Sequence, residues 1–322
     1  MHNLTGFTSK IKTYAKSLGF DAVGITHPDT LSESEQDLKR YLEENRHGTM
    51  LWLANTAEQR VHPKAYFPEA RAVVMVALNY FRKSEKFQYP ADTGTISVYA
   101  RGRDYHKVLR QKLKDLSRWI SQEIPSARGR IFVDSFPIME KPLAVRAGLG
   151  WLGKNTTLLL KAKGSYFFLG GILLNLDLKP DSPFTAEYCG SCQNCLKACP
   201  TGALDRPYQL DSRKCISYLT IEHHGSIENQ LQDKMDNLIF GCDICQMVCP
   251  WNQKFATHCQ VDDFKNRFKK EKISLVRLSQ LSRRLFDKMF EGTPIRRCGY
   301  RNFLRNVHIA QKNLERGLNK NA

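Results

Sequence analysis

The residues with the clearest chemical signature are cysteines. The chain has ten, and eight of them fall between Cys189 and Cys249, whereas none precedes Cys189. The first run reads Cys-x2-Cys-x2-Cys-x3-Cys-Pro over residues 189–200, which is the spacing by which bacterial ferredoxins hold [4Fe–4S] clusters. Structural zinc sites use separated pairs of ligands, so four cysteines within eleven residues favour a cluster over zinc.

A second run repeats this pattern without its first member. It reads Cys-x2-Cys-x3-Cys-Pro over residues 242–250, with Ile239 where the first thiol would stand, and Cys215 can supply the missing thiolate from a longer loop. In two-cluster ferredoxins the last cysteine of a run binds the other cluster. We therefore predict two [4Fe–4S] clusters with crossed ligand sets. The first set is Cys189, Cys192, Cys195 and Cys249, and the second is Cys199, Cys215, Cys242 and Cys245.

Two other motifs match ligand signatures only in part. Gly148–Thr156 fits G-x-G-x-x-G, but a helix-like stretch precedes it instead of a strand, so we do not interpret it as a nucleotide site. Its glycines would let the backbone lie close to a large flat or anionic ligand. Asp104–Leu109 resembles the Asp-x-His-x-x-Gly signature of histidines that bind cobalt, but Leu109 replaces the glycine. We interpret His106 as a surface or capping histidine.

The composition excludes several classes of protein. Hydrophobic residues make up 42% and charged residues 25% of 322 residues, which is ordinary globular usage and argues against disorder, collagen and coiled coil. No apolar run approaches the ~20 residues of a membrane span, and the first sixteen residues lack the apolar core of a secretory signal. We expect a cytoplasmic protein, where cysteines bind metal more often than they form disulfides.

The charge is strongly positive and concentrated near the end of the chain. The net charge is +17, and residues 261–322 hold sixteen Lys and Arg against six Asp and Glu. Such a balance favours a polyanionic partner such as nucleic acid. The segment also carries apolar residues at helical spacing, which predicts folded helices with a basic face. These residues are Ile273, Leu275, Val276, Leu278, Leu281, Leu285, Phe286 and Phe290.

The elements that must position these residues fall into three parts. Residues 1–178 read as mixed α/β, residues 179–258 contain the cysteine runs after a proline-containing boundary, and residues 259–322 form the basic helical tail. Within the first part, the patterns predict helices over residues 8–18, 105–120 and 138–147, and strands over 21–26, 72–79, 130–134 and 165–178.

The order of these motifs identifies one family. The chain resembles the epoxyqueuosine reductases, cobalamin- and iron–sulfur-dependent enzymes that perform the last step of queuosine biosynthesis in tRNA. The resemblance covers residues 8–310 and rests on Val133-Asp134-Ser135, Ala147–Thr156, Gly164–Gly170, Cys189–Leu204, Cys215–Thr220 and Gly241–Gln246.

The resemblance implies an α+β fold. A nitroreductase-like α/β domain would bind cobalamin, a ferredoxin-like domain would bind two [4Fe–4S] clusters, and a short basic tail would begin a helical-repeat domain. The implied activity is reduction of epoxyqueuosine to queuosine in the tRNA anticodon loop. Two electrons would pass through the clusters to cobalamin, from a donor such as flavodoxin or ferredoxin. We expect a monomer with no membrane contact.

The resemblance also assigns roles to single residues. Asp134 would be the proton donor, and we expect burial beside the macrocycle to raise its pKa above the ordinary value near 3.9. Glu140 is a rival acid, and a cap on the turn before Pro137 is the alternative role for Asp134. The cobalt would have no histidine ligand. The implied cobalamin contacts are Arg60, Asp134, Lys154, Asn155, Leu158, Ser165, Leu169, Ser217 and Asp243.

For tRNA, the expected contacts are His223, His224, the basic tail and the basic face of residues 107–118. Two alternative functions stay open at this point. One is a cobalamin- and cluster-dependent reductase of a small molecule, similar to reductive dehalogenases, whose turnover would not depend on RNA. The other is a non-enzymatic ferredoxin-type electron carrier, whose first half would bind no corrin.

Overall fold

An antiparallel four-stranded sheet lies at the centre of the first part of the chain. The computed structural model describes residues 6–82, 90, 92–268 and 273–320. The strand order is β1 (Ala22–Thr26), β2 (Ala72–Asn79), β7 (Phe167–Leu174) and β4 (Gly129–Phe132), and every neighbouring pair is antiparallel. The predicted strand 72–79 has the bounds of β2, and helices and strands mix as the α+β fold class requires.

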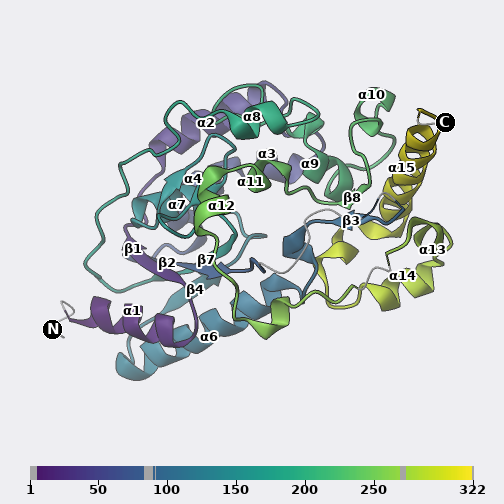
Figure 1. Ribbon diagram of the computed structural model, residues 1–322. Coiled ribbons are helices and arrows are strands. Elements are labelled where there is room, and N and C mark those ends of the chain that lie inside the picture. Colours follow the sequence, from purple (N-terminus) through teal and green to yellow (C-terminus); the bar gives the residue numbers. More distant parts are fainter. Residues whose placement is uncertain (1–5, 83–89, 91, 269–272, 321–322) are drawn as a thin grey trace.

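Helices cover both faces of this sheet (Figure 1). Successive side chains of β2 point to opposite faces and so contact different helices. The side chains of Val74 and Val76 pack against α1 (Phe7–Ser17) and α6 (Tyr105–Glu123). Those of Val73 and Met75 face the opposite layer. That layer contains α2 (Ser32–Glu43), α4 (Ala57–Val61) and α7 (Glu140–Arg146). Because both faces are covered, all eight residues of β2 are buried.

Short elements connect these layers. The helices α3 (Leu51–Asn55) and α5 (Pro63–Tyr66) flank α4, and the hairpin of β5 (Trp151–Leu152) and β6 (Leu158–Leu159) follows α7. The cysteine-rich segment is built from turns and short helices. These are α8 (Asn194–Ala198), η2 (Ser212–Lys214), α9 (Ile216–Ile221), α10 (Asn229–Gln232), α11 (Ile244–Met247) and α12 (Pro250–Phe255).

A small parallel pairing joins the first part of the chain to the cysteine-rich part. The strand β3 (Thr95–Ile96), which precedes a 3₁₀ turn at Val98–Ala100 (η1), pairs with β8 (Leu238–Phe240). Ile96 and Phe240 then share a hydrophobic cluster with residues of the tail. The three sequence segments therefore interlock, and whether each folds as a separate domain stays a prediction.

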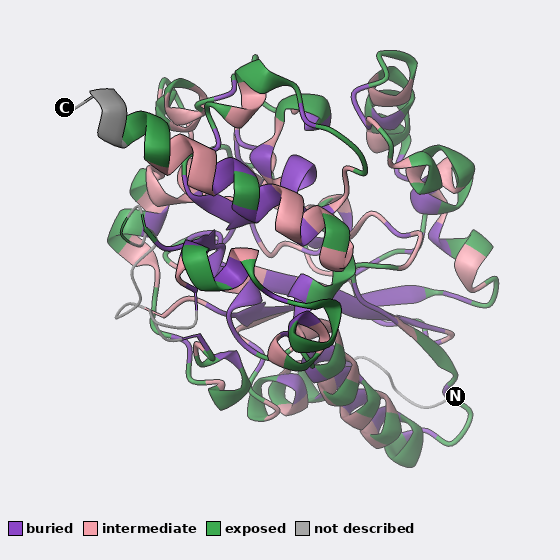
Figure 2. Ribbon diagram, turned by 90° about the vertical axis from the view of Figure 1, so that its right-hand side faces the viewer, coloured by how far each residue is buried: buried purple, intermediate pink, exposed green. Residues whose placement is uncertain are grey.

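The tail is helical, as its apolar spacing predicts. After a 3₁₀ turn at Asp262–Phe264 (η3), it contains α13 (Leu275–Ser279), α14 (Arg283–Met289), a 3₁₀ turn at Pro294–Cys298 (η5) and α15 (Gly299–Lys320). The long α15 buries one face and exposes the other (Figure 2). Two of the eight expected core residues are wrong, because Val276 is 65% and Leu285 52% exposed. The helices α13 and α14 are short, so each presents fewer residues inward than a continuous helix would.

The described helices offer no membrane span. None of them is both long enough and apolar enough to cross a bilayer.

The glycine-rich block serves a purpose different from the one its sequence predicts. A Cβ on Gly150 would lie 1.9 Å from the carbonyl oxygen of Leu159, and Gly148 has a φ of +75° beside the carbonyl of Ser182. At these two positions the missing side chains make room for the chain's own backbone. The expectation that these glycines admit a ligand is therefore wrong for both.

Gly150→Ala tests this packing. We expect it to destabilise the fold by about 1–3 kcal/mol, because the new methyl group overlaps backbone that cannot swing away. The measurement is the free energy of unfolding from denaturant titration of the cluster-free chain. Gly317→Ala is the control, since its Cβ meets nothing within 4 Å, and helix propensity there favours alanine. Equal stability of both variants would contradict the account.

Candidate functional site

Asp134 lies two residues beyond the end of β4, in an unusual backbone conformation. Its φ is +49°, a left-handed value that is uncommon for residues other than glycine. The Tyr105 hydroxyl donates to its Oδ2 at 2.9 Å, and His106 Nε2 lies 2.8 Å from the same oxygen. The Asp134 backbone N–H donates to Glu140 Oε1 at 2.5 Å. The side chain is still 45% exposed, so the carboxylate is held in place but remains open to a ligand.

His106 connects two carboxylates. Asp104 caps α6 by accepting from the backbone N–H of His106, and its Oδ1 also lies 2.8 Å from His106 Nδ1. Burial alone would lower the pKa of His106, but its hydrogen bonds to Asp104 and Asp134 outweigh burial and raise this pKa to about 9. The capping residue of α6 is Asp104, whose side chain accepts from the His106 N–H, so the interpretation of His106 as a capping histidine is wrong. The expectation of a surface side chain is wrong, because the ring bridges Asp104 and Asp134.

The two acids next to each other have different pKa values. Burial raises the pKa of Glu140 to about 8, and the nearby Asp134 carboxylate adds to this rise. Burial also acts to raise the pKa of Asp134, but hydrogen bonds from His106 and Tyr105 outweigh it and lower this pKa. The expected rise of this pKa beside a bound macrocycle stays a prediction. At neutral pH the protons reside on His106 and Glu140, next to an ionised Asp134.

A cavity of about 230 Å³ opens at Asp134. Arg60 is only 8% exposed, and its guanidinium lies 4.9 Å from the centre of the Trp52 ring. Arg297 reaches the cavity from the tail and donates to Glu222 Oε1 at 2.7 Å. Burial acts to lower the pKa of Arg297, but the carboxylates of Glu222 and Asp134 raise it. The cavity is lined by Trp52, Thr56, Arg60, Asp134, Ser135, Pro137 and Arg297.

The first predicted cysteine set surrounds a second, enclosed cavity. The volume is about 150 Å³, and all four cysteines of the set line it together with Lys154 and Asn155. Burial raises the pKa of the Cys189 thiol, whereas the Lys154 backbone N–H and the Trp151 indole N–H act in the opposite direction. Donors aimed at the sulfur favour its thiolate form, which is the form that binds iron. The four cysteines are Cys189, Cys192, Cys195 and Cys249.

The second predicted set lies deeper. Burial raises the pKa of Cys242 to about 12, with further contributions from the thiols of Cys215 and Cys199. Burial raises that of Cys245 well above its usual value, again with other cysteines close by. No three metal-binding side chains among the described residues come close enough to hold a single ion. A cubane requires wider spacing, because each of its thiolates binds a different iron.

The predicted cobalamin contacts Lys154 and Asn155 lie beside the cysteines. Lys154 Nζ donates to the carbonyls of Gly190 and Cys192, the latter at 3.0 Å. Asn155 Nδ2 donates to the Cys245 carbonyl at 3.3 Å. Together these two residues connect the loop after β5 to both cysteine runs.

Other predicted cobalamin contacts are enclosed by protein. Ser165 exchanges hydrogen bonds with Asn252, and Asp243 accepts from Ser97 Oγ at 2.6 Å and from the Val98 N–H at 2.9 Å. Leu158 is buried in the core, and Leu169 packs against that core. Ser217 directs its backbone N–H toward the Cys215 thiol. Of the predicted cobalamin contacts, only Arg60 and Asp134 line the 230 Å³ cavity.

The predicted tRNA contacts His223 and His224 lie at a turn held by the tail. His223 Nε2 is 2.9 Å from the Ser226 carbonyl, and His224 Nδ1 is 2.7 Å from Asn302 Nδ2. Arg305 of α15 donates to the carbonyls of His223 and Gly225. A surface hollow of about 520 Å³ adjoins this turn and is lined partly by basic residues of α15.

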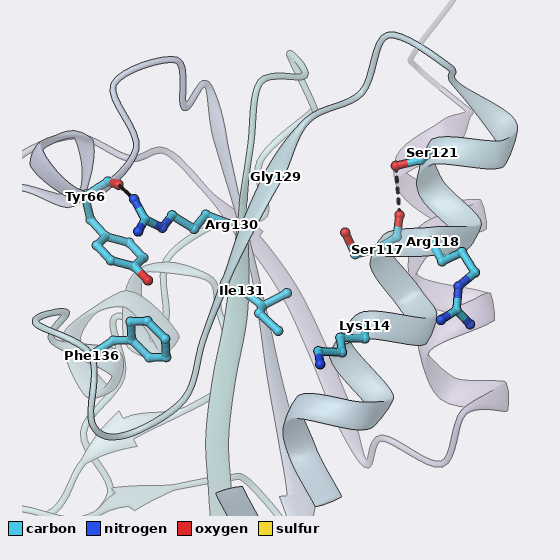
Figure 3. Close-up of a pocket in the computed structure, with 9 residues that line it drawn as sticks. All are labelled: Tyr66, Lys114, Ser117, Arg118, Ser121, Gly129, Arg130, Ile131 and Phe136. Atoms are coloured by element: carbon cyan, nitrogen blue, oxygen red, sulfur yellow. Dashed lines mark hydrogen bonds between the residues drawn. The ribbon is translucent and has the colours of Figure 1, made fainter. Parts of the chain in front are cut away.

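A larger groove lies between α6 and β4, and Phe136 of the loop that follows β4 also lines it (Figure 3). Its volume is about 620 Å³. Lys114 and Arg118 stand one turn apart on α6 along one side, and Arg130, Tyr66 and Phe136 form the other side. The Arg130 guanidinium lies 4.1 Å from the Tyr66 ring centre. Cations and aromatic rings thus face each other across an open surface.

The sequence did not single out several residues of the site. Trp52, Tyr105 and Arg297 carry no motif of their own. His106 was considered as a cobalt ligand and as a surface or capping histidine, but not as a partner of Asp134. The available signal was the helix start at Asp104, which places Tyr105 and His106 in the first turn of α6.

Comparison with known proteins places this arrangement in a family. Residues 60–135 match the family model "Epoxyqueuosine reductase QueG, DUF1730". The epoxyqueuosine reductase of Escherichia coli (strain K12) is 43% identical over 314 residues, which cover 97% of this chain and 82% of that protein. The chain belongs to the epoxyqueuosine reductase family.

Solved epoxyqueuosine reductases share the fold. One crystal structure, with an epoxyqueuosine-modified tRNA-Tyr stem loop, has a TM-score of 0.88 and 30% identity, covering 97% of this chain and 83% of that one. The Bacillus subtilis epoxyqueuosine reductase, with its catalytic aspartate loop swung out of the active site, has a TM-score of 0.87 and 29% identity over 97% and 83%. Residues 188–252 match the 4Fe-4S double cluster binding domain, so this reductase carries a two-cluster module.

The His106 titration is a direct test of the site. Because its folded pKa of about 9 exceeds the ordinary 6.5, protonated His106 stabilises the fold fully below pH 6.5. That contribution is lost as the pH rises through about 9. We expect the ring signals, followed by NMR with labelled histidine, to titrate near pH 9, and Asp104→Asn to shift this midpoint downward. A midpoint at or below 6.5 in the unaltered protein would contradict the geometry.

Proposed function

We propose that this protein reduces epoxyqueuosine to queuosine in the anticodon loop of tRNA. The observation that carries the proposal is the position of the Asp134–His106–Asp104 chain on an open cavity, in a protein that also holds a two-cluster module. The reaction removes one oxygen from the substrate and consumes two electrons and two protons. The chain must therefore bring electrons and protons to the same cavity.

The two cysteine sets give electron transfer a direction, from the surface of the protein toward its interior. We infer that Cys189, Cys192, Cys195 and Cys249 bind one cluster near the surface. The deeper cluster is held by Cys199, Cys215, Cys242 and Cys245. The Cys245 thiol acts electrostatically on the Lys141 ammonium, as the carboxylates of Glu140 and Asp134 do, and we infer that the second set lies on the side of the catalytic cavity. Electrons then enter at the first set and leave from the second.

Cobalamin is the inferred final carrier. When bound, it supplies a strongly reducing centre for a strained carbon–oxygen bond. The residues around Asp134 are compatible with such a ligand. The exposed indole of Trp52 and the cation of Arg60 offer an apolar face and a donor for amide groups, and Lys141 directs its ammonium to a single carbonyl, that of Thr156. A separate cavity of about 320 Å³ is lined by Lys141 and Thr156 and offers further space for the cofactor on this side.

Among the residues predicted to hold cobalamin, Arg60 and Asp134 are the contacts we retain for the open cavity. Lys154, Asn155 and Ser217 are inferred to act from the cluster side. Ser165 and Asp243, which are bonded within the protein, support the surrounding backbone. Leu158 and Leu169 support it by packing.

Protons come from the chain's own residues. His106 holds a proton at neutral pH and lies 2.8 Å from Asp134 Oδ2. We infer that Asp134 relays a proton from His106 to the departing oxygen, while Asp104 stabilises the imidazolium that supplies it. An ionised Asp134 at rest is consistent with this order, because the proton is delivered only when the oxygen develops charge. In the Bacillus subtilis enzyme the catalytic aspartate loop can swing out of the active site.

We infer that the RNA contacts several surfaces near this cavity. A base in an anticodon loop can be splayed out and stacked on an aromatic side chain, and Trp52 is 42% exposed at the cavity. We infer that the flanking strand lies in the groove of Lys114, Arg118 and Arg130 (Figure 3). The turn of His223 and His224 and the basic face of α15 are further proposed contacts.

Asp134→Asn tests the proton donor. We expect both cofactors to bind as before and turnover to fall about 10²–10⁴-fold, the usual contribution of a general acid. The measurement is conversion of epoxyqueuosine-containing tRNA under anaerobic conditions. Asp177→Asn, an exposed residue paired with Arg71, is the control and should leave turnover unchanged. Normal turnover of Asp134→Asn would remove this residue from the mechanism.

Cys215→Ser tests the cluster assignment. Removing one thiolate of the second set should leave about four iron atoms per chain in place of about eight, because each cluster holds four. Iron and sulfide analysis of anaerobically reconstituted protein measures this loss. Cys259→Ser is matched to it, since Cys259 is buried and donates to the Asn79 carbonyl. An unchanged iron content in Cys215→Ser would mean that another residue completes the set.

Lys114→Ala combined with Arg118→Ala tests the groove. Each phosphate contact with a single strand contributes about 0.7 to the slope of log affinity against log salt. We expect the double variant to weaken binding of an anticodon stem loop and to reduce this slope by about 1.4. Fluorescence anisotropy across a salt series measures both quantities. Lys10→Ala with Lys16→Ala on α1 is the charge-matched control, and an equal change in that variant would contradict a specific groove.

A further inference from the structure

The cavity of the first cysteine set opens beside a cluster of aromatic side chains. Tyr188 and Trp251 line it together with the cysteines. Their ring centres lie 5.6 Å apart, and the Trp251 ring also lies 5.1 Å from the Phe255 ring in a tilted arrangement. Tyr188 is 38% exposed. The outer side of this cavity is thus an aromatic surface that reaches solvent, and neither the proton chain nor the RNA groove uses it.

Two exposed lysines border these rings. Lys161 Nζ lies 5.5 Å from the centre of the Tyr188 ring, and Lys254 Nζ lies 5.2 Å from that of Phe255. Neither lysine forms a salt bridge with any described residue. Glu187 is the nearby acid, but its carboxylate accepts from the backbone N–H groups of Cys189 and Gly190. We call Tyr188, Trp251, Phe255, Lys161 and Lys254 the aromatic–lysine rim.

The rim adjoins the more accessible of the two cysteine sets. Every cysteine of the first set lines a cavity that Tyr188 and Trp251 of the rim also line, whereas no cysteine of the second set lines it. The catalytic cavity shares no lining residue with the first set. A partner at the rim could therefore deliver electrons without blocking access to Asp134.

We propose that the aromatic–lysine rim is the docking surface for an acidic one-electron carrier protein. Its two unpaired lysines would attract the carrier's negative surface, and its aromatic rings would form a small apolar contact over the first cluster. Weak electron-transfer complexes use small interfaces of this kind, in which charge guides the encounter. The inference rests on the proposed function, because it takes the first cysteine set to hold a cluster.

A protein carrier fits this surface better than RNA does. An RNA loop must place its base at Asp134, and the cations that flank that loop are Lys114, Arg118 and Arg130. Three rim residues, Trp251, Lys254 and Phe255, belong to α12, which follows the second cysteine run (Figure 1). A lysine pair over an aromatic surface offers few phosphate contacts, but it can complement a cluster of carboxylates.

Lys161→Glu combined with Lys254→Glu tests the proposal in the cluster-loaded protein. The probe is reduced flavodoxin, an acidic one-electron carrier, and the readout is the stopped-flow loss of cluster absorbance. We expect the second-order rate constant to fall at least about tenfold at low salt, and the difference to shrink as salt screens the charges. Binding of oxidised flavodoxin, followed by calorimetry, should weaken in parallel.

The control is Lys10→Glu with Lys16→Glu on α1, which lies across the sheet from the cysteine-rich segment (Figure 1). Dithionite should reduce the clusters of all variants equally, which shows that the clusters are intact. An unchanged rate with flavodoxin, or an equal loss in the α1 control, would overturn the docking surface. So would a rim variant that loses affinity for the stem loop but keeps its rate with flavodoxin.

The same data separate this inference from the proposed function. If dithionite-reduced protein fails to convert epoxyqueuosine-tRNA while the rim variant slows reduction by flavodoxin, the proposed function fails and the docking surface stands. If conversion with dithionite is normal and the rim variant has no effect, the docking surface alone fails.

Discussion

A buried carboxylate holds the cysteine-rich segment against the rest of the protein. Asp243 lies between Cys242 and Cys245, and both of its oxygens accept hydrogen bonds from residues 97 and 98 of the first part of the chain. A buried carboxylate without such partners would be costly, so this contact fixes one register. The pairing of β3 with β8 next to it reinforces the same register. The position of the deeper cysteine set relative to the catalytic cavity follows from these contacts.

Opposing effects of burial and of neighbouring charges set the protonation of the groups around the Asp134 cavity. One carboxylate, Asp134, receives two donors and stays ionised, and its neighbour Glu140 is pushed toward the neutral form. His106 keeps its proton because two carboxylates face it. The left-handed backbone at Asp134 is the local strain that accompanies this arrangement. We propose that this arrangement stores a proton on His106 next to an ionised Asp134, which relays it to the substrate.

The sequence predicts those features whose chemistry is local. Cysteine spacing encodes ligand sets directly, which is why the four thiols of the first set meet around one cavity. Continuous apolar runs gave β2 its bounds. Contacts between distant residues were not predictable in this way. His106 and Asp134 are 28 residues apart and meet only because α6 begins where β4 ends. Arg297 reaches the cavity only because the tail packs against the cysteine-rich segment.

The central proposal is that the second cysteine set holds a cluster close to the cobalamin of the Asp134 cavity. Electron paramagnetic resonance tests it most directly, because cob(II)alamin and a reduced [4Fe–4S] cluster are both paramagnetic. In protein loaded with both cofactors and reduced, we predict that the cobalt signal is broadened or split by the nearby cluster spin, and that this coupling disappears when Cys215 is changed to serine. A cobalt signal that is unaltered by cluster reduction in the intact protein would contradict the account.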